Sequence, residues 1–443
     1  MYLQSISQYS DFRKSDCREF YFIIRQGYAR GSRVSIDIVG LQLVPGISGF
    51  WVQDQPAIQT GAKKDGFFYE GSPVSPGFLK IKEPSFAYCL TLQLKNGAMA
   101  MGDCVTVVDV GYAGRPIPLR LENLSMVKKA LTDQLVGKNF TSFKQAAAAL
   151  ESLPFPDNIA IPIAYGASQA LLDATARSTG TTMTEVLRNE FAIKTEYEIP
   201  GFAAVCEGDW YGNVDKAIAR RFAMFPHCGI QRKEDVDRLP EYVAWMLERV
   251  RKYGSSDYKP DLHIDFHSML GRILENDLDK VCKFLCEVSD RAKPYQVYFE
   301  DPLLARNVDE ARENMRRIRT KLDASGASCR LIADEWANSP GSVAKFAGDH
   351  AAHAVQIKMP DNGNLLNSIS AIRSCQENDV LAYLGGSVNE TDTSARVSVH
   401  VGLAFKVWRM LAKPGKGLDE GLMIMTNELA RTCGQLGITG PDL

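Results

Sequence analysis

Hydrophobic and polar residues follow two different rhythms along the N-terminal part of the chain. From about Val34 to Leu121, short apolar stretches such as VSIDIVGLQLV, GFLKIKE and AYCLTLQL are separated by Gly- and Pro-rich pieces, and KNGA is typical of a hairpin turn. From about Ser125 to Arg188 the apolar residues recur at helical spacing instead, in LSMVKKALTDQLV, SFKQAAAALESL and GASQALLDATARS. Strands followed by helices predict an α+β domain over residues 34–195.

After Ile199 short apolar runs alternate with long amphipathic stretches, and the runs are GFAAVC, LHIDF, QVYFED, RLIADE, AVQIKM and VLAYLGG. This alternation predicts parallel strands joined by right-handed helical crossovers. Six or more such units fit a (β/α)8 barrel of the TIM type over residues 196–443. An open doubly wound sheet is the alternative, but it usually binds a nucleotide, and no glycine-rich phosphate motif follows any of these strands.

Composition and charge narrow the class of protein. The 443 residues are 45% hydrophobic and 23% charged, which is typical of a globular protein, and no apolar run reaches the length of a membrane span. The net charge of −2 gives no reason to expect a nucleic acid or membrane partner. Ten scattered cysteines without a C-x-x-C pair indicate free thiols and a cytoplasmic location. Residues 1–33 mix Arg and Lys with acids, unlike most transit peptides, so we expect an N-terminal extension outside both domains.

Four polar residues stand where successive barrel strands end. LHIDF presents Asp265, QVYFED presents Glu300, RLIADE presents Asp334, and AVQIKM presents Lys358. Each lies about one strand–helix unit after the previous one, so the four side chains belong to four successive strands. Chemistry in TIM barrels gathers at this end of the strands.

A single acid at a strand end often does no more than cap the next helix. Three carboxylates on three consecutive strands are harder to explain in that way, because they repel one another unless a cation lies between them. Oxygen donors with no Cys or His at strand spacing favour a hard cation, and Mg²⁺ in particular. We therefore expect a Mg²⁺ site made of Asp265, Glu300 and Asp334.

A divalent cation facing a lysine suits the removal of a proton from the carbon next to a carboxylate. The cation stabilises the negative charge that develops on the carboxylate oxygens, and an amine takes the proton. We expect the cation to lower the pKa of Lys358 and make it a base near neutral pH. A half-buried strand whose polar residues simply meet solvent is the alternative explanation for Lys358.

The chain resembles the enolase superfamily, and within it the methylaspartate ammonia-lyase family. The resemblance covers about residue 36 to near the C-terminus. Its motifs are PGISGFWVQDQPAIQTGAKKDGFFYEGSPVSPGF (45–78), GDC (102–104), YGASQALLDA (165–174), NVDKAI (213–218), PHC (226–228), HIDF, ADEWAN (333–338), VQIKMPD, YLGGSVNET (383–391) and AKPGKGLDEGLMI (412–424).

This resemblance implies a set of roles. Lys358 would remove the C3 proton of (2S,3S)-3-methylaspartate, and ammonia would leave C2 to give mesaconate. His227, which from the residues alone favours a structural role, would contact the substrate carboxylate from the opposite face and serve the other C3 epimer. Gln356 would hydrogen-bond the same carboxylate, and Tyr383 and Leu411 would line the pocket. The resemblance also suggests a homodimer and allows for a monovalent cation such as K⁺, which no motif in this chain decides.

The sequence departs from the family where the substrate's α-carboxylate binds. The family's glutamine on the first barrel strand is replaced by Ala204 or Val205, depending on where one extra residue is placed. The family's Thr-Cys pair after the YLGG stretch is Ser387-Val388 here. Losing one charge-assisted hydrogen bond costs roughly 1.5–3 kcal/mol, or about one to two decades in binding.

Three hypotheses follow from these residues. The first is a Mg²⁺-dependent carbon–nitrogen lyase acting on 3-methylaspartate or a near relative. The second is a divergent superfamily lyase or dehydratase that applies the same chemistry to a different carboxylic acid. The third is a barrel retained as a binding or scaffold protein, which the intact set of charged residues argues against.

Overall fold

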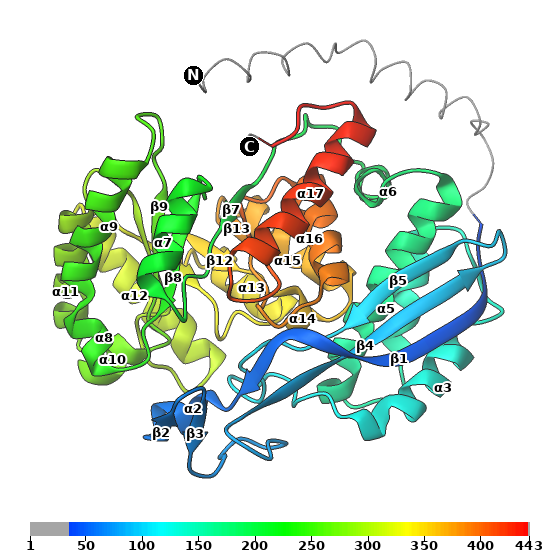
Figure 1. Cartoon of the computed structure of the whole chain (residues 1–443), viewed down its shortest axis with the longest axis horizontal. Coiled ribbons are helices and arrows are strands. Elements are labelled where there is room, and N and C mark those ends of the chain that lie inside the picture. Colours follow the sequence, from blue (N-terminus) through cyan, green and yellow to red (C-terminus); the bar gives the residue numbers. More distant parts are fainter. Residues whose placement is uncertain (1–34, 442–443) are drawn as a thin grey trace, which may run out of the picture.

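The N-terminal part of the described chain is built on an antiparallel sheet (Figure 1). The computed structural model describes residues 35–441, so the predicted extension 1–33 lies outside the described residues. Alternate residues of the second long strand, including Leu90, Leu92 and Leu94, are buried in the core, as a period of two predicts. The sheet order is β5-β4-β1-β6, with β1 (Ile36–Gln53), β4 (Lys82–Leu94), β5 (Met99–Cys104) and β6 (Asn139–Phe140).

Helices pack against this sheet and complete the predicted α+β domain. Helix α5 lies against β4 and β5, and it approaches β5 through two glycines. A Cβ atom on Gly102 would lie 2.2 Å from the carbonyl oxygen of Gly166, so the contact requires residues without side chains. The helices are α3 (Leu124–Leu135), α4 (Phe143–Ala148), α5 (Asp157–Thr179) and α6 (Met183–Glu190), with the 3₁₀ turns η1 (Leu121–Asn123) and η2 (Ala149–Ser152).

A small hairpin and a short helix extend from this domain toward the loops of the barrel. They are α2 (Gln55–Gln59), β2 (Lys63–Asp65) and β3 (Phe68–Glu70). The side chain of Gln59 donates to the backbone oxygen of His267 at 3.1 Å. The capping domain therefore contacts the barrel loops directly.

The C-terminal part of the described chain is a closed barrel of eight parallel strands, as predicted. Going around the barrel, the order is β10-β11-β12-β13-β14-β7-β8-β9. The strands are β7 (Gly201–Ala203), β8 (Met224–Gly229), β9 (Asp261–Asp265), β10 (Val297–Glu300), β11 (Arg330–Ala333), β12 (Ala354–Gln356), β13 (Leu381–Leu384) and β14 (Arg409–Leu411).

A long helix follows each strand and covers the outside of the barrel (Figure 1). These helices are α7 (Trp210–Ala219), α9 (Leu239–Tyr253), α11 (Leu278–Ala292), α12 (Val308–Ala324), α13 (Pro340–Gly348), α15 (Leu365–Glu377), α16 (Asp392–Phe405) and α17 (Asp419–Leu436). Short helices α8 (Lys233–Asp237), α10 (Met269–Ile273) and α14 (Met359–Asn362) lie in the loops. None of the helices in residues 35–441 combines the length and the apolar character needed to cross a membrane.

The six predicted barrel strands are confirmed, but two were not predicted. Strand β8 contains Pro226, which interrupts the usual strand pattern, and β14 is only three residues long. The predicted strand GFLKIKE is wrong over most of its length, since only its last two residues belong to β4. The backbone N–H of Leu79 donates to the side chain of Glu83 at 3.3 Å rather than to a neighbouring strand.

Candidate active site

The four residues predicted at the strand ends lie at the mouth of the barrel. Asp265 ends β9 and pairs in register with Glu300, which ends β10. Asp334 is the first residue after β11. Lys358 is the second residue after β12, separated from the strand by Ile357. The three carboxylates are buried, with 2%, 0% and 2% of their surface exposed. The structure thus brings these residues to adjacent positions on four successive strands.

Lys358 is held in an ion pair inside the mouth. Its Nζ lies 2.5 Å from Oδ2 of Asp334. Burial lowers the pKa of Lys358, but the carboxylates of Asp334 and Glu335 outweigh burial and raise it above its ordinary value. The chain's own residues therefore favour the ammonium form, and the lowered pKa expected from the sequence depends on a cation at these carboxylates. Asp334 makes the larger contribution to this rise, and Glu335, which the strand-end pattern did not single out, adds to it.

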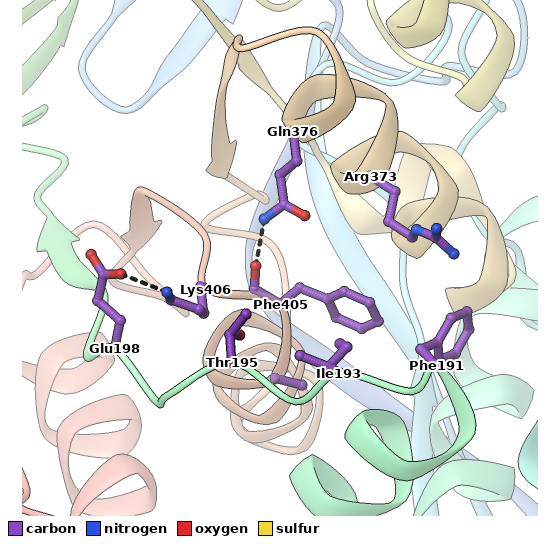
Figure 2. Close-up of a pocket in the computed structure, with 9 residues that line it drawn as sticks. Phe191, Ile193, Thr195, Glu198, Arg373, Gln376, Phe405 and Lys406 are labelled. Atoms are coloured by element: carbon purple, nitrogen blue, oxygen red, sulfur yellow. Dashed lines mark hydrogen bonds and ion pairs between the residues drawn. The ribbon is translucent and has the colours of Figure 1, made fainter.

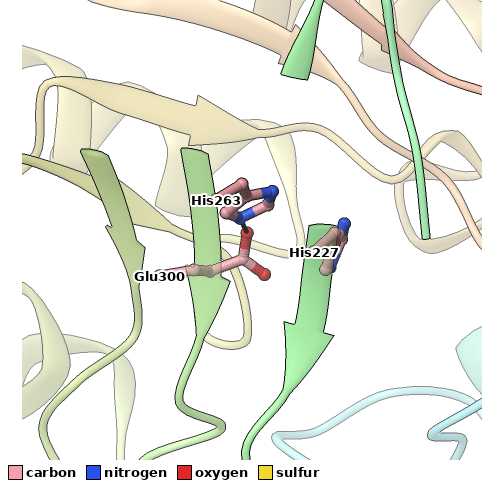
Figure 3. Close-up of side chains that lie close together, drawn as sticks. All are labelled: His227, His263 and Glu300. Atoms are coloured by element: carbon pink, nitrogen blue, oxygen red, sulfur yellow. Dashed lines mark hydrogen bonds and ion pairs between the residues drawn. The ribbon is translucent and has the colours of Figure 1, made fainter. Parts of the chain in front are cut away.

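Glu300 is fixed by hydrogen bonds on both of its oxygens. The ring Nε2 of His263 lies 2.7 Å from Oε2 (Figure 3), and the side-chain amide of Gln356 donates to Oε1 at 2.7 Å. Burial raises the pKa of Glu300 well above its ordinary value, and repulsion from Asp265 and Asp334 adds to the rise. A positive charge at this position would remove that penalty.

His227 reaches the mouth from the other side of the barrel. It lies in β8, which is four places from β12 in a ring of eight strands, so His227 and Lys358 come from opposite sides. Its backbone φ is +46°, a left-handed conformation that non-glycine residues adopt at a cost and that is common at functional sites. Its Nε2 is 3.8 Å from Oδ2 of Asp265, and its Nδ1 is 3.5 Å from the hydroxyl of Tyr383.

The predicted metal ligands provide the chemistry that Mg²⁺ requires. Asp265, Glu300 and Asp334 supply buried oxygen donors, and Oδ1 of Asp334 has no hydrogen-bond partner, although the guanidinium of Arg115 lies 3.7 Å from it. An unpartnered buried carboxylate oxygen is costly unless a cation or a donor meets it. The three residues therefore fit a magnesium ion.

In the described part of the chain, two groups of residues hold their possible ligand atoms within 4.8 Å of one another, and the predicted set of Asp265, Glu300 and Asp334 is not one of them. The two groups are His227, His263 and Glu300, and a second set made of Asp109, His267 and Glu335. In the first group the ring of His263 is already hydrogen-bonded to Glu300 (Figure 3), so it orients the carboxylate. Histidine nitrogens also suit transition metals better than Mg²⁺.

Several residues of the mouth were missed by sequence reasoning. The guanidinium of Arg115, from a loop of the capping domain, is ion-paired to Glu335 and to Asp361 and lies 3.7 Å from Asp334. Arg115 is 6% exposed, and these carboxylates hold its pKa well above its ordinary value. The ring of His267 lies 2.9 Å from Asp265. Glu335 and Asp361 lie within the motifs ADEWAN and VQIKMPD but were given no role, whereas Arg115 stands in a Gly- and Pro-rich stretch that carries no strand-end signal.

The predicted substrate-contacting residues line a cavity of about 70 Å³ at the mouth. Gln356, Ser387, Val388 and Leu411 are on its surface together with His227 and Lys358, whereas Tyr383 lies below it, fully buried. The two residues that could stand in place of the family glutamine have different surroundings. Val205 lines the cavity, whereas Ala204 packs outward in the core between the barrel and its helices.

A larger hollow of about 400 Å³ lies on the surface away from the mouth (Figure 2). It is formed by the segment after α6 and the ends of α15 and α16. Lys406 is ion-paired there to Glu198 at 3.2 Å, and Gln376 donates to the backbone oxygen of Phe405. None of the residues predicted at the strand ends reaches this hollow.

Comparison with known proteins gives the same family for both domains. The family model of the methylaspartate ammonia-lyase N-terminus matches residues 36–192, and that of the C-terminus matches residues 195–437. Methylaspartate ammonia-lyase of Clostridium tetanomorphum is 36% identical over 408 residues, which cover 90% of this chain and 99% of the relative.

Solved structures agree with this result. A magnesium complex of the Clostridium tetanomorphum beta-methylaspartase has a TM-score of 0.84 at 35% identity, over 90% of this chain and 99% of that one. The Citrobacter amalonaticus methylaspartate ammonia lyase, which contains (2S,3S)-3-methylaspartic acid, has a TM-score of 0.86 at 34% identity over the same shares. Muconate lactonizing enzyme from Pseudomonas putida, at 15% identity and a TM-score of 0.57, shares the fold over 83% of this chain and 85% of its own.

Proposed function

This chain belongs to the methylaspartate ammonia-lyase family, and we propose that it eliminates ammonia from 3-methylaspartate or a near relative of it. The observation that carries the proposal is the arrangement around the mouth. Three buried carboxylates end β9, β10 and β11, while Lys358 and His227 approach the same cavity from opposite sides of the barrel. A substrate carboxylate held through a cation at Asp265, Glu300 and Asp334 would have its neighbouring carbon between the two side chains.

Asp265, Glu300 and Asp334 would hold Mg²⁺. Bound there, the ion supplies positive charge that stabilises the negative charge developing on the substrate carboxylate. His263 and Gln356 keep Glu300 oriented through the two hydrogen bonds at 2.7 Å.

Lys358 is the base in this proposal. As the neutral amine, the form that positive charge at Asp334 would favour, its Nζ takes the C3 proton of the (2S,3S) substrate, and the electron pair of the C3–H bond forms the C2–C3 double bond. The C2–N bond then breaks with its electron pair on nitrogen, so ammonia and mesaconate are the products. Asp334, at 2.5 Å from Nζ, holds the lysine in place and shares its proton. His227, on the other side, serves the epimer at C3.

Removal of the lysine amine tests the proposal. Ammonia release from (2S,3S)-3-methylaspartate with Mg²⁺ is measured for the wild-type protein and for Lys358→Ala. We expect the rate to fall by about 10²–10⁴-fold, the usual contribution of a positioned base. Lys345→Ala, an exposed lysine on α13, is the matched control and keeps the wild-type rate. Equal rates for wild-type protein and Lys358→Ala would contradict the role of Lys358.

We further propose that the chain acts as a homodimer in the cytoplasm, with residues 34–195 as the capping domain and 196–443 as the catalytic domain. The homodimer rests on the family resemblance. The cytoplasmic location is supported by the cysteines of residues 35–441, which are all free thiols. Size-exclusion chromatography with light scattering would test the dimer.

A further inference from the structure

One wall of the mouth cavity is apolar. Val108, Val205, Val388 and Leu411 form this apolar wall, and they come from four separate segments: a capping-domain loop, the end of β7, the loop after β13 and the end of β14. They belong to one hydrophobic cluster and are between 2% and 8% exposed. Four separate segments thus deliver aliphatic side chains to one surface.

The apolar wall lies across the barrel from the carboxylates. Asp265 and Glu300 end β9 and β10 and Asp334 follows β11, whereas the barrel part of the wall lies at the ends of β13, β14 and β7 or just beyond them. Lys358 and His227 come from the two strands that separate these arcs, β12 and β8. A substrate with its carboxylate at the acidic arc and its reacting carbon between Lys358 and His227 therefore points its far end at the apolar wall.

The basic groups around the cavity already have partners. Of the basic side chains that line it in residues 35–441, Lys416 is ion-paired to Glu207, Lys358 to Asp334 and His267 to Asp265. His227, the remaining one, faces Asp265 at 3.8 Å. A second substrate carboxylate would have to displace one of these contacts.

Ser387, the polar residue that precedes Val388 of the wall, is also engaged. The hydroxyl oxygen of Ser387 accepts from the backbone N–H of Val108 at 2.9 Å and from that of Asn389 at 3.2 Å. Only its own proton is left to donate into the cavity. This single hydroxyl cannot supply the charge-assisted contacts that a buried carboxylate requires.

We propose that the preferred substrates are 3-aminocarboxylic acids that carry an apolar substituent, in place of a second carboxylate, on the carbon bearing the amine. This inference rests on the proposed function. The reaction is balanced in the same way: the C–H bond next to the carboxylate gives its proton to Lys358, the C–N bond breaks with its electrons on nitrogen, and ammonia and an α,β-unsaturated monoacid are released.

A matched pair of substrates tests the proposal. In 3-amino-2-methylbutanoate a methyl group replaces the second carboxylate of 3-methylaspartate, and every other reacting atom is the same. We expect kcat/KM for ammonia release, with Mg²⁺, to be at least about tenfold higher for the monoacid, the usual effect of one unsatisfied charge-assisted hydrogen bond. A preference for 3-methylaspartate would overturn the inference and leave the proposed function standing.

Variants of the wall add a second readout. Val205→Gln places an amide on the wall and shifts the preference by about tenfold toward 3-methylaspartate, whereas Val205→Leu keeps the wild-type preference. Thermal unfolding shows that both variants are folded. An unchanged preference in Val205→Gln would overturn the role of the wall. A third variant, Lys416→Met, covers the opposite outcome. If the wild-type protein prefers 3-methylaspartate and Lys416→Met abolishes that preference, the inference is wrong. Lys416 then leaves Glu207 to bind the second carboxylate.

Failure of the reaction itself gives a distinct result. If the Mg²⁺-loaded protein releases ammonia from neither compound, the proposed function fails. Calorimetry with the unreactive acids 2-methylbutanoate and methylsuccinate then decides the inference separately. Tighter binding of the monoacid supports an apolar subsite, and tighter binding of the diacid overturns it.

Discussion

Lys413 is a buried ammonium group outside the proposed chemistry. It has no exposed surface, and its Nζ lies 2.7 Å from Oε2 of Glu390 and donates to the backbone oxygen of Gly385 at 2.9 Å. The hydroxyl of Tyr165, from the capping domain, donates to the other oxygen of Glu390 at 2.6 Å. These contacts hold the loop that carries Ser387 and Val388, so Lys413 contributes to the shape of the cavity without touching it.

Removal of the acid should leave the ammonium group without its partner. Glu390→Gln is expected to lower the free energy of unfolding by about 3–5 kcal/mol, the usual cost of breaking a buried pair. Tyr165→Phe removes only one hydrogen bond and is expected to cost about 1 kcal/mol. Urea unfolding measures both. Equal losses in the two variants would contradict the ion pair as the main stabilising contact.

Glu428 connects the stability of the protein to pH. Burial raises the pKa of Glu428, but hydrogen bonds from His400, Arg431 and Arg396 outweigh burial and lower it to about 2. A carboxyl whose pKa is lower in the folded state stabilises the fold above its unfolded pKa, near 4.5, and this contribution is lost as pH falls toward 2. Urea unfolding should therefore show that the free energy of unfolding falls less between pH 5 and pH 2 in Glu428→Gln than in the wild-type protein. The same acid dependence in both proteins would refute this assignment.

At the scale of elements, the contact between α5 and β5 depends on residues without side chains. A Cβ atom on Gly166 would lie 2.4 Å from the backbone nitrogen of Cys104. Gly166→Ala should therefore push the helix from the sheet and cost about 1–3 kcal/mol or more. Gly434→Ala on α17, where nothing lies within 4 Å, should instead stabilise by about 0.5–1 kcal/mol. Thermal unfolding compares the stability of the two variants. Unchanged stability in Gly166→Ala would contradict the tight contact between α5 and β5.

The barrel strands were predictable because each is a short apolar run bounded by polar residues. This local pattern placed Asp265, Glu300, Asp334 and Lys358 correctly at the strand ends. It failed for β8, where Pro226 breaks the run, although His227 in that strand was found through the family motif. It also could not decide between Ala204 and Val205, because an inserted residue changes which side chain faces the cavity.

At the scale of the whole molecule, the capping domain completes the mouth. Arg115 brings a positive charge to Glu335, Asp361 and Asp334, which belong to the barrel. The backbone of Gly49 in β1 also donates to the carbonyl oxygen of Glu390 at 3.0 Å. Such contacts join segments more than two hundred residues apart, so no local sequence pattern could predict them. The domain boundaries at 34 and 195 stay predictions.

Loss of Arg115 should affect the whole mouth. Arg115→Ala leaves buried carboxylates without their counter-charge, and we expect the free energy of unfolding to fall by about 3–5 kcal/mol. Arg115→Lys keeps the charge but cannot reach Glu335 and Asp361 together, so an intermediate loss is expected. Chemical unfolding of the full chain measures both variants. Wild-type stability in Arg115→Ala would show that the bridge between the domains is unimportant.

The central claim is that Lys358 moves the proton on the carbon next to the substrate carboxylate. Hydrogen exchange in D₂O measures this step directly, by NMR of substrate recovered after incubation with protein and Mg²⁺. The account predicts deuterium at that carbon with wild-type protein and with Lys345→Ala, and none above background with Lys358→Ala. Exchange at the wild-type rate in folded Lys358→Ala would contradict it.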